Sequence, residues 1–155
     1  MNDTIIIGIG NDFRCDDAIG IITVKKLKEM NIPEIDLIEH NRDGAELMDI
    51  WNNYTNVFII DAASMRNSAG SIHRIDALKN KLPNEIGAYS THLFSVAEAI
   101  ETSKILGKLP EKFIIYAIEG KNFNLGTEVS KEVLKASNEV IKNIINEIGL
   151  ISEKI

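Results

Sequence analysis

The fold is decided by the stretch Ile5-Ile6-Ile7-Gly8-Ile9-Gly10-Asn11-Asp12-Phe13-Arg14-Cys15-Asp16-Asp17-Ala18-Ile19-Gly20. Its opening run, residues 5–9, is apolar throughout, which is typical of a strand buried on both faces of a parallel sheet. Gly10-Asn11-Asp12 ends that strand, because Gly and Asn accept the positive φ of a sharp exit. Asp16 and Asp17 then precede an apolar helical pattern, where the helix N-terminus favours a carboxylate. We therefore predict a strand, a loop, an acid pair and a helix, with the chemistry at the carboxyl end of the strand.

This stretch does not have the features of a dinucleotide-binding turn. The fingerprint Gly-x-Gly-x-x-Gly would require a third glycine at the position of Phe13. A phosphate would also be repelled by the two carboxylates at the start of the helix. Capping the helix accounts for one aspartate of the pair. The other aspartate is therefore a candidate functional residue.

Composition narrows the class of protein. The 155 residues are 45% hydrophobic and 26% charged, as in a soluble globular protein, and residues 1–155 are expected to form a single domain. A formal net charge of −6 without a basic run argues against nucleic acid as a partner. No apolar run is long enough to span a membrane, and the first strand begins too early for a signal peptide. The single cysteine excludes an internal disulfide and a Cys-based zinc site, so we expect a cytoplasmic protein.

Apolar runs alternate with amphipathic patterns along the rest of the chain. This alternation predicts an α/β fold, a three-layer α/β/α sandwich with a mostly parallel central sheet of about five strands. Ligands of such sheets bind at the carboxyl ends of the strands. The predicted strands are 5–9, 35–39, 57–60, 71–75 at an edge, and 113–118; the predicted helices are 18–30, 46–51, 93–106 and 127–148, and 151–155 is a frayed tail.

Three side chains are candidates for a site at that edge. Asp17 follows the first strand, Asp61 follows the strand 57–60, and His92 precedes a helix. Two carboxylates and one imidazole form a plausible ligand set for a divalent metal and leave coordination positions open. The same residues are also compatible with a helix cap, a loop aspartate and a structural or surface histidine, which are the commoner uses of single residues of these types. Cys15 is expected to be structural, because its acidic neighbours oppose the thiolate.

Several segments together resemble the hydrogenase maturation proteases. Gly8-Ile9-Gly10-Asn11 followed by Asp16-Asp17-Ala18-Ile19-Gly20 is similar to the amino-terminal signature of that family. Ile59-Ile60-Asp61-Ala62 is similar to its strand-end aspartate, and Ser90-Thr91-His92 to its histidine segment. Tyr116-Ala117-Ile118-Glu119-Gly120 resembles the stretch after its last strand. Many members carry a glycine-rich turn where this chain has His40-Asn41-Arg42-Asp43-Gly44, and this difference bears on the choice of partner.

The resemblance implies an endopeptidase that trims the carboxyl-terminal extension of a nickel–iron hydrogenase large-subunit precursor. The family's metal-binding trio falls on Asp17, Asp61 and His92 of this sequence. The metal implied is nickel carried by the substrate, with no organic cofactor. The nickel would polarise a peptide carbonyl or activate a water, with Asp17 or Asp61 as general base. The alternatives are a relative that docks the precursor without cutting it, and a receiver-type domain with Asp61 as phosphoacceptor.

Overall fold

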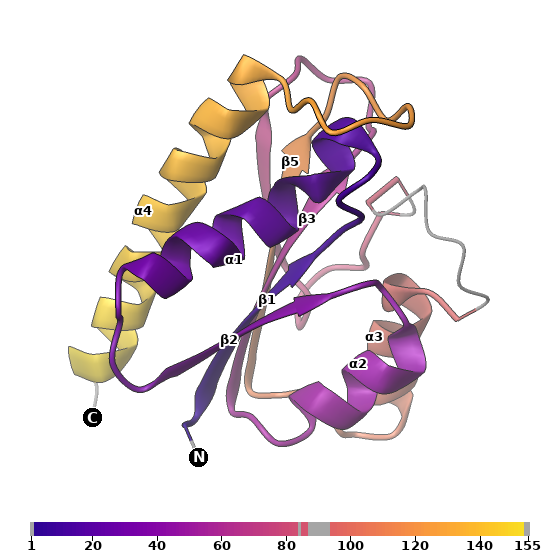
Figure 1. Ribbon diagram of the computed structural model, residues 1–155. Helices are drawn as coiled ribbons and strands as arrows, with labels where there is room; N and C mark the ends of the chain where they lie inside the picture. Colours follow the sequence, from indigo (N-terminus) through magenta and orange to yellow (C-terminus); the bar gives the residue numbers. More distant parts are fainter. Residues whose placement is uncertain (1, 84, 87–93, 154–155) are drawn as a thin grey trace.

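The computed structural model describes residues 2–83, 85–86 and 94–153 and contains a five-stranded sheet (Figure 1). The strand order is β2-β1-β3-β5-β4. All neighbouring pairs are parallel except β4 and β5, which are antiparallel. The elements are β1 (Thr4–Ile9), the 3-10 helix η1 (Cys15–Ala18), α1 (Ile19–Glu29), β2 (Ile35–His40), α2 (Gly44–Trp51), β3 (Asn56–Ala63), β4 (Ile72–Asp76), α3 (Val96–Ile105), β5 (Lys112–Glu119) and α4 (Lys131–Glu153).

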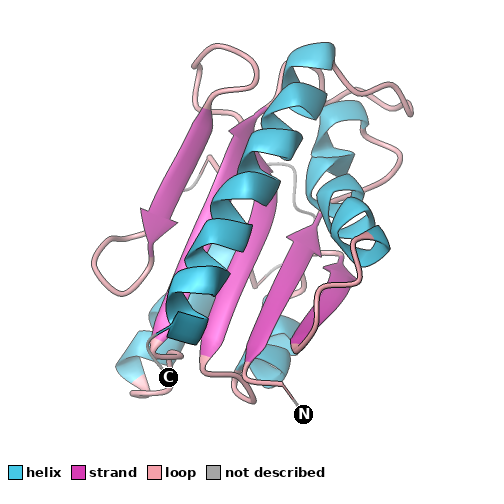
Figure 2. Cartoon of the chain, turned by 90° about the vertical axis from the view of Figure 1, so that its left-hand side faces the viewer, coloured by secondary structure: helices cyan, strands magenta, loops and turns pink. Residues whose placement is uncertain are grey.

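Helices cover both faces of this sheet, as predicted. In Figure 2, α4 and α1 lie in front of the strands, while α2 and α3 lie behind them. Side chains of β1, β3 and β5 point alternately to the two faces and form two separate apolar cores. Trp51 is fully buried in one core and meets the Phe113 ring edge-on at 4.8 Å. Across the described part of the chain, no helix is both long and apolar enough to cross a membrane.

Several predictions about the ends of elements were wrong, and the largest differences are in β3 and α4. Strand β3 continues to Ala63, so Asp61 lies within the strand and not after it. Helix α4 begins at Lys131, because residues 120–130 form a loop held by side-chain hydrogen bonds, and it runs to Glu153 where a frayed tail was expected. Neither Asp16 nor Asp17 caps η1 or α1, since no side-chain hydrogen bond is made at either N-cap.

Two glycines let α1 pack directly on the sheet. A Cβ on Gly20 would lie 2.3 Å from the carbonyl oxygens of Ile9 and Ile60, and one on Gly8 would lie 2.2 Å from the Gly20 carbonyl oxygen. Both distances are far shorter than van der Waals contact, so no larger residue fits without moving the backbone. The close packing of α1 against β1 and β3 in turn determines where the preceding turn, η1, is placed.

Replacing Gly20 by alanine is expected to destabilise the fold. The added methyl group meets backbone on two strands, and overpacking of this kind costs about 1–3 kcal/mol or more. Gly149→Ala in α4 is the matched control, because a Cβ there meets nothing within 4 Å. We expect the control to be neutral or to stabilise by about 0.5–1 kcal/mol, as alanine favours helix. Urea denaturation of both variants measures the difference, and equal stability would contradict the close-packing argument.

Candidate functional site

Asp17 is placed at the carboxyl end of β1 by a tight return of the chain. The Asp17 carbonyl oxygen accepts a hydrogen bond from the Asn11 backbone N–H at 3.3 Å. A Cβ on Gly10 would lie 2.2 Å from that same oxygen, so only glycine permits this return. The backbone N–H of Gly10 donates to the His40 carbonyl at the end of β2. The turn after β1 is thus anchored to its own strand and to the neighbouring strand.

Asp17 and Asp61 converge on one point, as the sequence predicted for both. Asp61 belongs to β3, which is the neighbour of β1 in the sheet, and both side chains are 1% exposed. The group that lies between them is the guanidinium of Arg42, which is itself 3% exposed. Arg42 follows β2, the strand on the other side of β1. Three adjacent parallel strands therefore each bring one charged side chain to the same edge.

Arg42 bonds both carboxylates at once. Its Nε donates to Asp61 Oδ2 at 3.2 Å, and its Nη1 donates to Asp17 Oδ2 at 2.9 Å. Its Nη2 donates to Asp61 Oδ1 at 2.6 Å and also to Asp17 Oδ1. The planar fork of a guanidinium suits such paired contacts. The two acidic side chains and the cation therefore form one buried ion-pair cluster.

Burial shifts the protonation equilibria of this cluster. Burial raises the pKa of Asp61 above its usual value; Arg42 opposes the rise, and the nearby Asp17 adds to it. For Arg42, burial alone lowers the pKa, but the attraction of Asp61 and the hydrogen bonds of both aspartates outweigh it. The pKa of Arg42 therefore lies above its usual value, and the guanidinium stays charged. A carboxyl whose pKa is raised is a stronger base than a free aspartate.

The backbone that carries Arg42 is held in an unusual conformation. Arg42 has φ +78°, a region that residues with a side chain rarely adopt. Its backbone N–H donates to His40 Nδ1 at 3.2 Å, which leaves the Nε2–H of His40 to donate to Glu46 at 2.9 Å. The sequence placed Arg42 only in a polar turn that departs from the glycine-rich turn of related proteins. Its long side chain ends between Asp17 and Asp61, and nothing in the local sequence indicates that position.

The third predicted ligand, His92, lies outside the described residues. Within residues 2–83, 85–86 and 94–153, no cluster of three or more His, Cys, Asp or Glu side chains is arranged to hold a metal ion. Asp17 and Asp61 present carboxylate oxygens to a common point. The donor type and the convergence fit a divalent cation. The position where such a cation would lie is that of the Arg42 guanidinium.

The neighbouring aspartate, Asp16, binds the loop between β5 and α4 and not Arg42. Its carboxylate accepts hydrogen bonds from the backbone N–H groups of Lys121, Asn122 and Ser130 at 2.7–3.0 Å, and from the Ser130 hydroxyl at 2.8 Å. These contacts tie both ends of the loop between β5 and α4 to η1. Asp16 is therefore the residue that orders this loop, a role distinct from that of Asp17.

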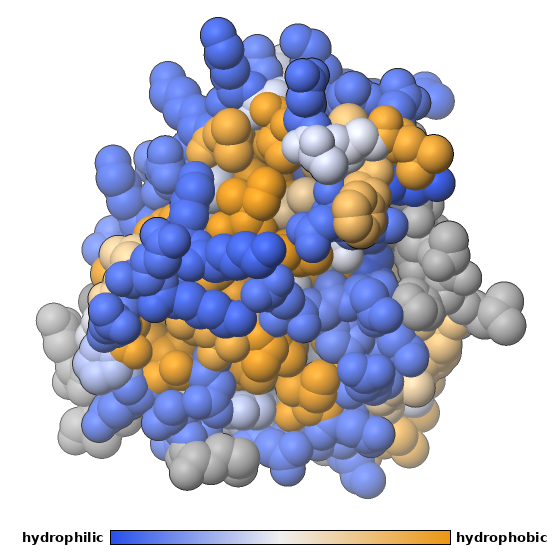
Figure 3. Space-filling model, viewed as in Figure 1, coloured by the Kyte–Doolittle hydropathy of each residue, from blue (hydrophilic) through white to orange (hydrophobic). Residues whose placement is uncertain are grey.

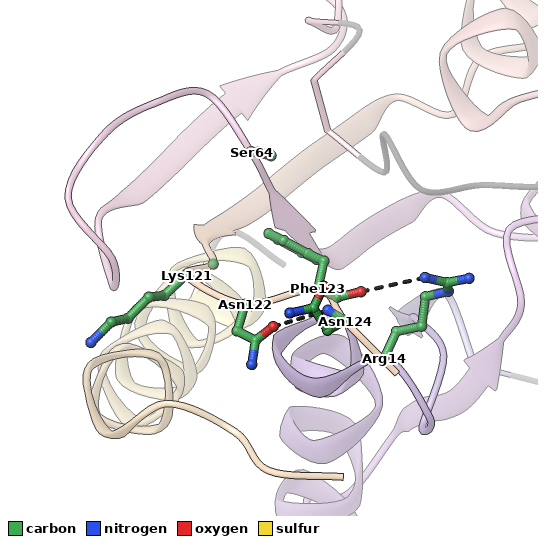
Figure 4. Close-up of a pocket in the computed structure, with 7 residues that line it drawn as sticks. Arg14, Ser64, Lys121, Asn122, Phe123 and Asn124 are labelled. Atoms are coloured by element: carbon green, nitrogen blue, oxygen red, sulfur yellow. Dashed lines mark hydrogen bonds between the residues drawn. The ribbon is translucent and has the colours of Figure 1, made fainter. Parts of the chain in front are cut away.

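The same loop borders a polar pocket of about 320 Å³ (Figure 4). Arg14, Lys121, Asn122 and Asn124 line it, and Arg14 Nη1 donates to the Phe123 carbonyl at 3.4 Å. Its wall includes Ser64, three residues beyond Asp61. The pocket thus lies on the edge of the sheet where the acidic pair lies.

Exposed apolar side chains lie near this edge. Figure 3 shows apolar surface beside the loop that leads into α4, at the upper right. Phe13 and Leu125 are 69% and 77% exposed. Their loops are joined, because the Gly126 N–H donates to the Phe13 carbonyl and the Cys15 N–H to the Gly126 carbonyl. We call Phe13 and Leu125 the apolar rim.

Cys15, expected to be structural, is buried against the same loop. Its side chain is 4% exposed, and a Cβ on Gly126 would lie 3.0 Å from its sulfur.

The surroundings of Asp61 do not support the phosphoacceptor alternative. That carboxylate is buried and bonded to Arg42, whereas an acceptor must be open to a phosphodonor.

Replacing Asp16 by asparagine is expected to loosen the loop 120–130. The amide offers one acceptor oxygen where the carboxylate offers two, and its NH₂ group faces backbone donors. Leaving these part-buried donors unpaired should cost about 1–3 kcal/mol of stability. Faster hydrogen exchange at the amides of Lys121, Asn122 and Ser130 would locate the effect. Asp12→Asn, in an exposed turn, is the control, and unchanged exchange in Asp16→Asn would refute the assignment.

Comparison with known proteins places the chain among relatives of one kind. The hydrogenase maturation protease family matches residues 21–147. A putative hydrogenase maturation protease of Methanocaldococcus jannaschii is 32% identical over 152 residues, which cover 94% of this chain and 96% of the relative. The hydrogenase 2 maturation protease of Escherichia coli is 26% identical and covers 74% of this chain and 71% of its own.

Solved structures agree with the sequence matches. The E. coli hydrogenase maturating endopeptidase HybD superposes with a TM-score of 0.78 at 17% identity, over 96% of this chain and 92% of that one. The [NiFe] hydrogenase maturation protease HybD of Thermococcus kodakarensis gives 0.69 at 25% identity, over 96% and 99%. The predicted three-layer fold is therefore confirmed. With a family match over most of its length, the chain belongs to the hydrogenase maturation proteases, a family of endopeptidases.

Proposed function

We propose that this protein removes the carboxyl-terminal extension of a nickel–iron hydrogenase large-subunit precursor after nickel has been inserted. Asp17, Asp61 and His92 would recognise the nickel that the precursor carries. The observation that supports this proposal is the convergence of Asp17 and Asp61 at the carboxyl ends of adjacent strands. The role of His92 rests on the family resemblance and not on observed contacts.

In this proposal the nickel is part of the substrate. The precursor's cysteines would hold the metal, and the aspartates would complete its coordination, which places the extension beside it. A metal in that position supplies a Lewis acid for the peptide carbonyl or for a water. We assign the role of general base to Asp61, because burial raises its pKa and makes it a stronger proton acceptor than an ordinary aspartate.

The surroundings of the acidic pair suit a protein substrate. The apolar rim of Phe13 and Leu125 offers exposed apolar contacts near η1. The polar pocket, whose lining includes Arg14, Asn122 and Asn124, offers polar groups to an extended segment. We assign docking of the precursor body to the rim, and binding of the extension to the pocket.

Processing of nickel-loaded precursor tests the activity directly. The purified chain is mixed with the precursor, with and without nickel, and the mobility shift is followed on a gel. We expect cleavage only with nickel, and a loss of at least roughly 100-fold in rate for Asp17→Asn or His92→Ala. Stable binding of the loaded precursor without cleavage would favour the docking-only alternative. Phosphorylation of Asp61 by a small phosphodonor without cleavage would favour the receiver alternative.

A matched control separates the site from general stability. Asp36 is a part-buried carboxylate at the amino end of β2, bonded to Tyr54 and Asn2. Asp36→Asn changes the same chemical group at the opposite edge of the sheet, so its cleavage rate should stay near that of the wild type. Rates are compared per folded molecule, because Asp17→Asn also removes a partner of Arg42. Equal losses of cleavage rate in Asp17→Asn and Asp36→Asn would contradict the assignment of Asp17 to the site.

Docking through the apolar rim is tested by removing its side chains. Phe13→Ser together with Leu125→Ser should raise KM for the loaded precursor by about tenfold, because exposed apolar contacts with the precursor are lost. The thermal melt should hardly change, since both residues are exposed. Ile105→Ser is the control: Ile105 is 84% exposed but ends α3, away from the rim. A KM that is unchanged in the double variant would exclude the rim as the docking surface.

A further inference from the structure

The cation already present in the acidic site is a side chain of the protein. Arg42 fills the point on which Asp17 and Asp61 converge and engages both oxygens of each carboxylate. Two carboxylates buried side by side need a compensating positive charge. Arg42 supplies it in the free protein, so that site is closed to other cations as long as the guanidinium stays there.

We propose that Arg42 is a displaceable placeholder that makes the site selective: it keeps free divalent cations out of the Asp17–Asp61 pair and yields only to nickel delivered on the docked precursor. This inference rests on the proposed function, in which the same carboxylates must reach the nickel. A guanidinium fixed permanently between them would occupy the point where the two carboxylates converge, and its positive charge would repel the metal there. Displacement of Arg42 is therefore required for recognition.

The energetics favour this selectivity. A free hydrated cation would have to lose water and break four buried hydrogen bonds, with no other contact to compensate. A docked precursor brings additional binding energy from its contacts with the protein, and such remote binding energy can offset a local cost. Free nickel and precursor-bound nickel therefore differ in the binding energy that the precursor's own contacts with the protein supply.

The position of Arg42 also suits movement. Its backbone is held at φ +78°, a strained conformation that leaving the site can relax. Asn41, its neighbour, is exposed, so the turn lies at the molecular surface. Beyond the turn, Gly44 donates a hydrogen bond to the Phe94 carbonyl, and a Cβ on Gly44 would clash with the Phe94 and Ser95 carbonyl oxygens. The turn is thereby anchored at its far end, which confines the movement to the segment around Arg42.

Nickel binding by the isolated, tag-free protein tests the placeholder. Isothermal titration calorimetry with NiCl₂ compares the wild type with Arg42→Gln. We expect Arg42→Gln to bind Ni²⁺ at least about tenfold more tightly, the change that ~1.4 kcal/mol of lost competition produces. Nickel should also raise the melting temperature of Arg42→Gln far more than that of the wild type. Equal affinities for the two proteins would overturn the proposal.

Two further variants serve as controls. Arg42→Gln with Asp61→Asn should lose the gained affinity, and a gain that persists would place the nickel elsewhere and overturn the proposal. Arg74→Gln removes the same charge from β4, where Arg74 pairs with Glu147, and should bind Ni²⁺ as the wild type does. A comparable gain in Ni²⁺ affinity in Arg74→Gln would mean that the change in net charge alone explains the gain, and it would also overturn the proposal.

Folding of the variants is itself informative. Arg42→Lys keeps one positive charge but cannot hold both carboxylates with a planar fork, so it should show a smaller gain in affinity. If the Arg42 variants fold only when Ni²⁺ is present, a divalent cation replaces the guanidinium and the proposal is supported. If they remain unfolded with Ni²⁺, the guanidinium is not replaceable and the proposal fails.

Cleavage assays separate this inference from the proposed function. Free Ni²⁺ should inhibit processing by Arg42→Gln at concentrations that leave the wild type active, because it occupies the carboxylates before the precursor docks. Failure of every protein, wild type included, to cleave the precursor would refute the proposed function while the nickel titration still stands. Normal wild-type cleavage without tighter Ni²⁺ binding in Arg42→Gln would refute the placeholder alone.

Discussion

Burial of two carboxylates at one edge of the sheet is the constraint on which the site depends. Asp17 and Asp61 are both 1% exposed, and like charges so placed repel each other strongly in the absence of a counter-charge. Arg42 provides that charge with hydrogen bonds to both. A buried pair of this kind contributes little net stability compared with apolar packing, but breaking it is costly. Its presence therefore points to function more than to stability.

The two neighbouring aspartates show how backbone geometry gives adjacent side chains different partners. The Asp16 carboxylate points toward the loop 120–130 and accepts hydrogen bonds from backbone N–H groups there. The Asp17 carboxylate points toward β3 and accepts hydrogen bonds from Arg42. The separation arises in η1, where a single turn directs consecutive side chains to different sides. Loss of either carboxylate would affect the protein, but for different physical reasons. The first orders the loop, and the second belongs to the site.

Close backbone packing sets the precision of the arrangement. Gly20 lets α1 rest on β1 and β3, and Gly10 lets the Asp17 carbonyl fold back on the strand end. Both contacts are between backbone atoms, which adjust less than side chains do. The carboxylate of Asp17 is thereby held at a defined place relative to Asp61. In the proposed function, such placement means that the ligands are positioned before the partner arrives.

The sequence by itself determined the fold class and the order of the main elements, and it indicated Asp17 and Asp61 as candidate site residues. Apolar runs such as 5–9 and 113–118 identify central strands, and parallel strands bring their carboxyl ends to one edge, so the pattern indicated an edge where Asp17 and Asp61 could meet. Only the tertiary structure decided what lies between them. Arg42 belongs to a polar turn with no distinguishing pattern, and its reach across β1 depends on strand order, burial and a positive φ. The same holds for Asp16, whose partners lie more than 100 residues away and are brought near only by folding.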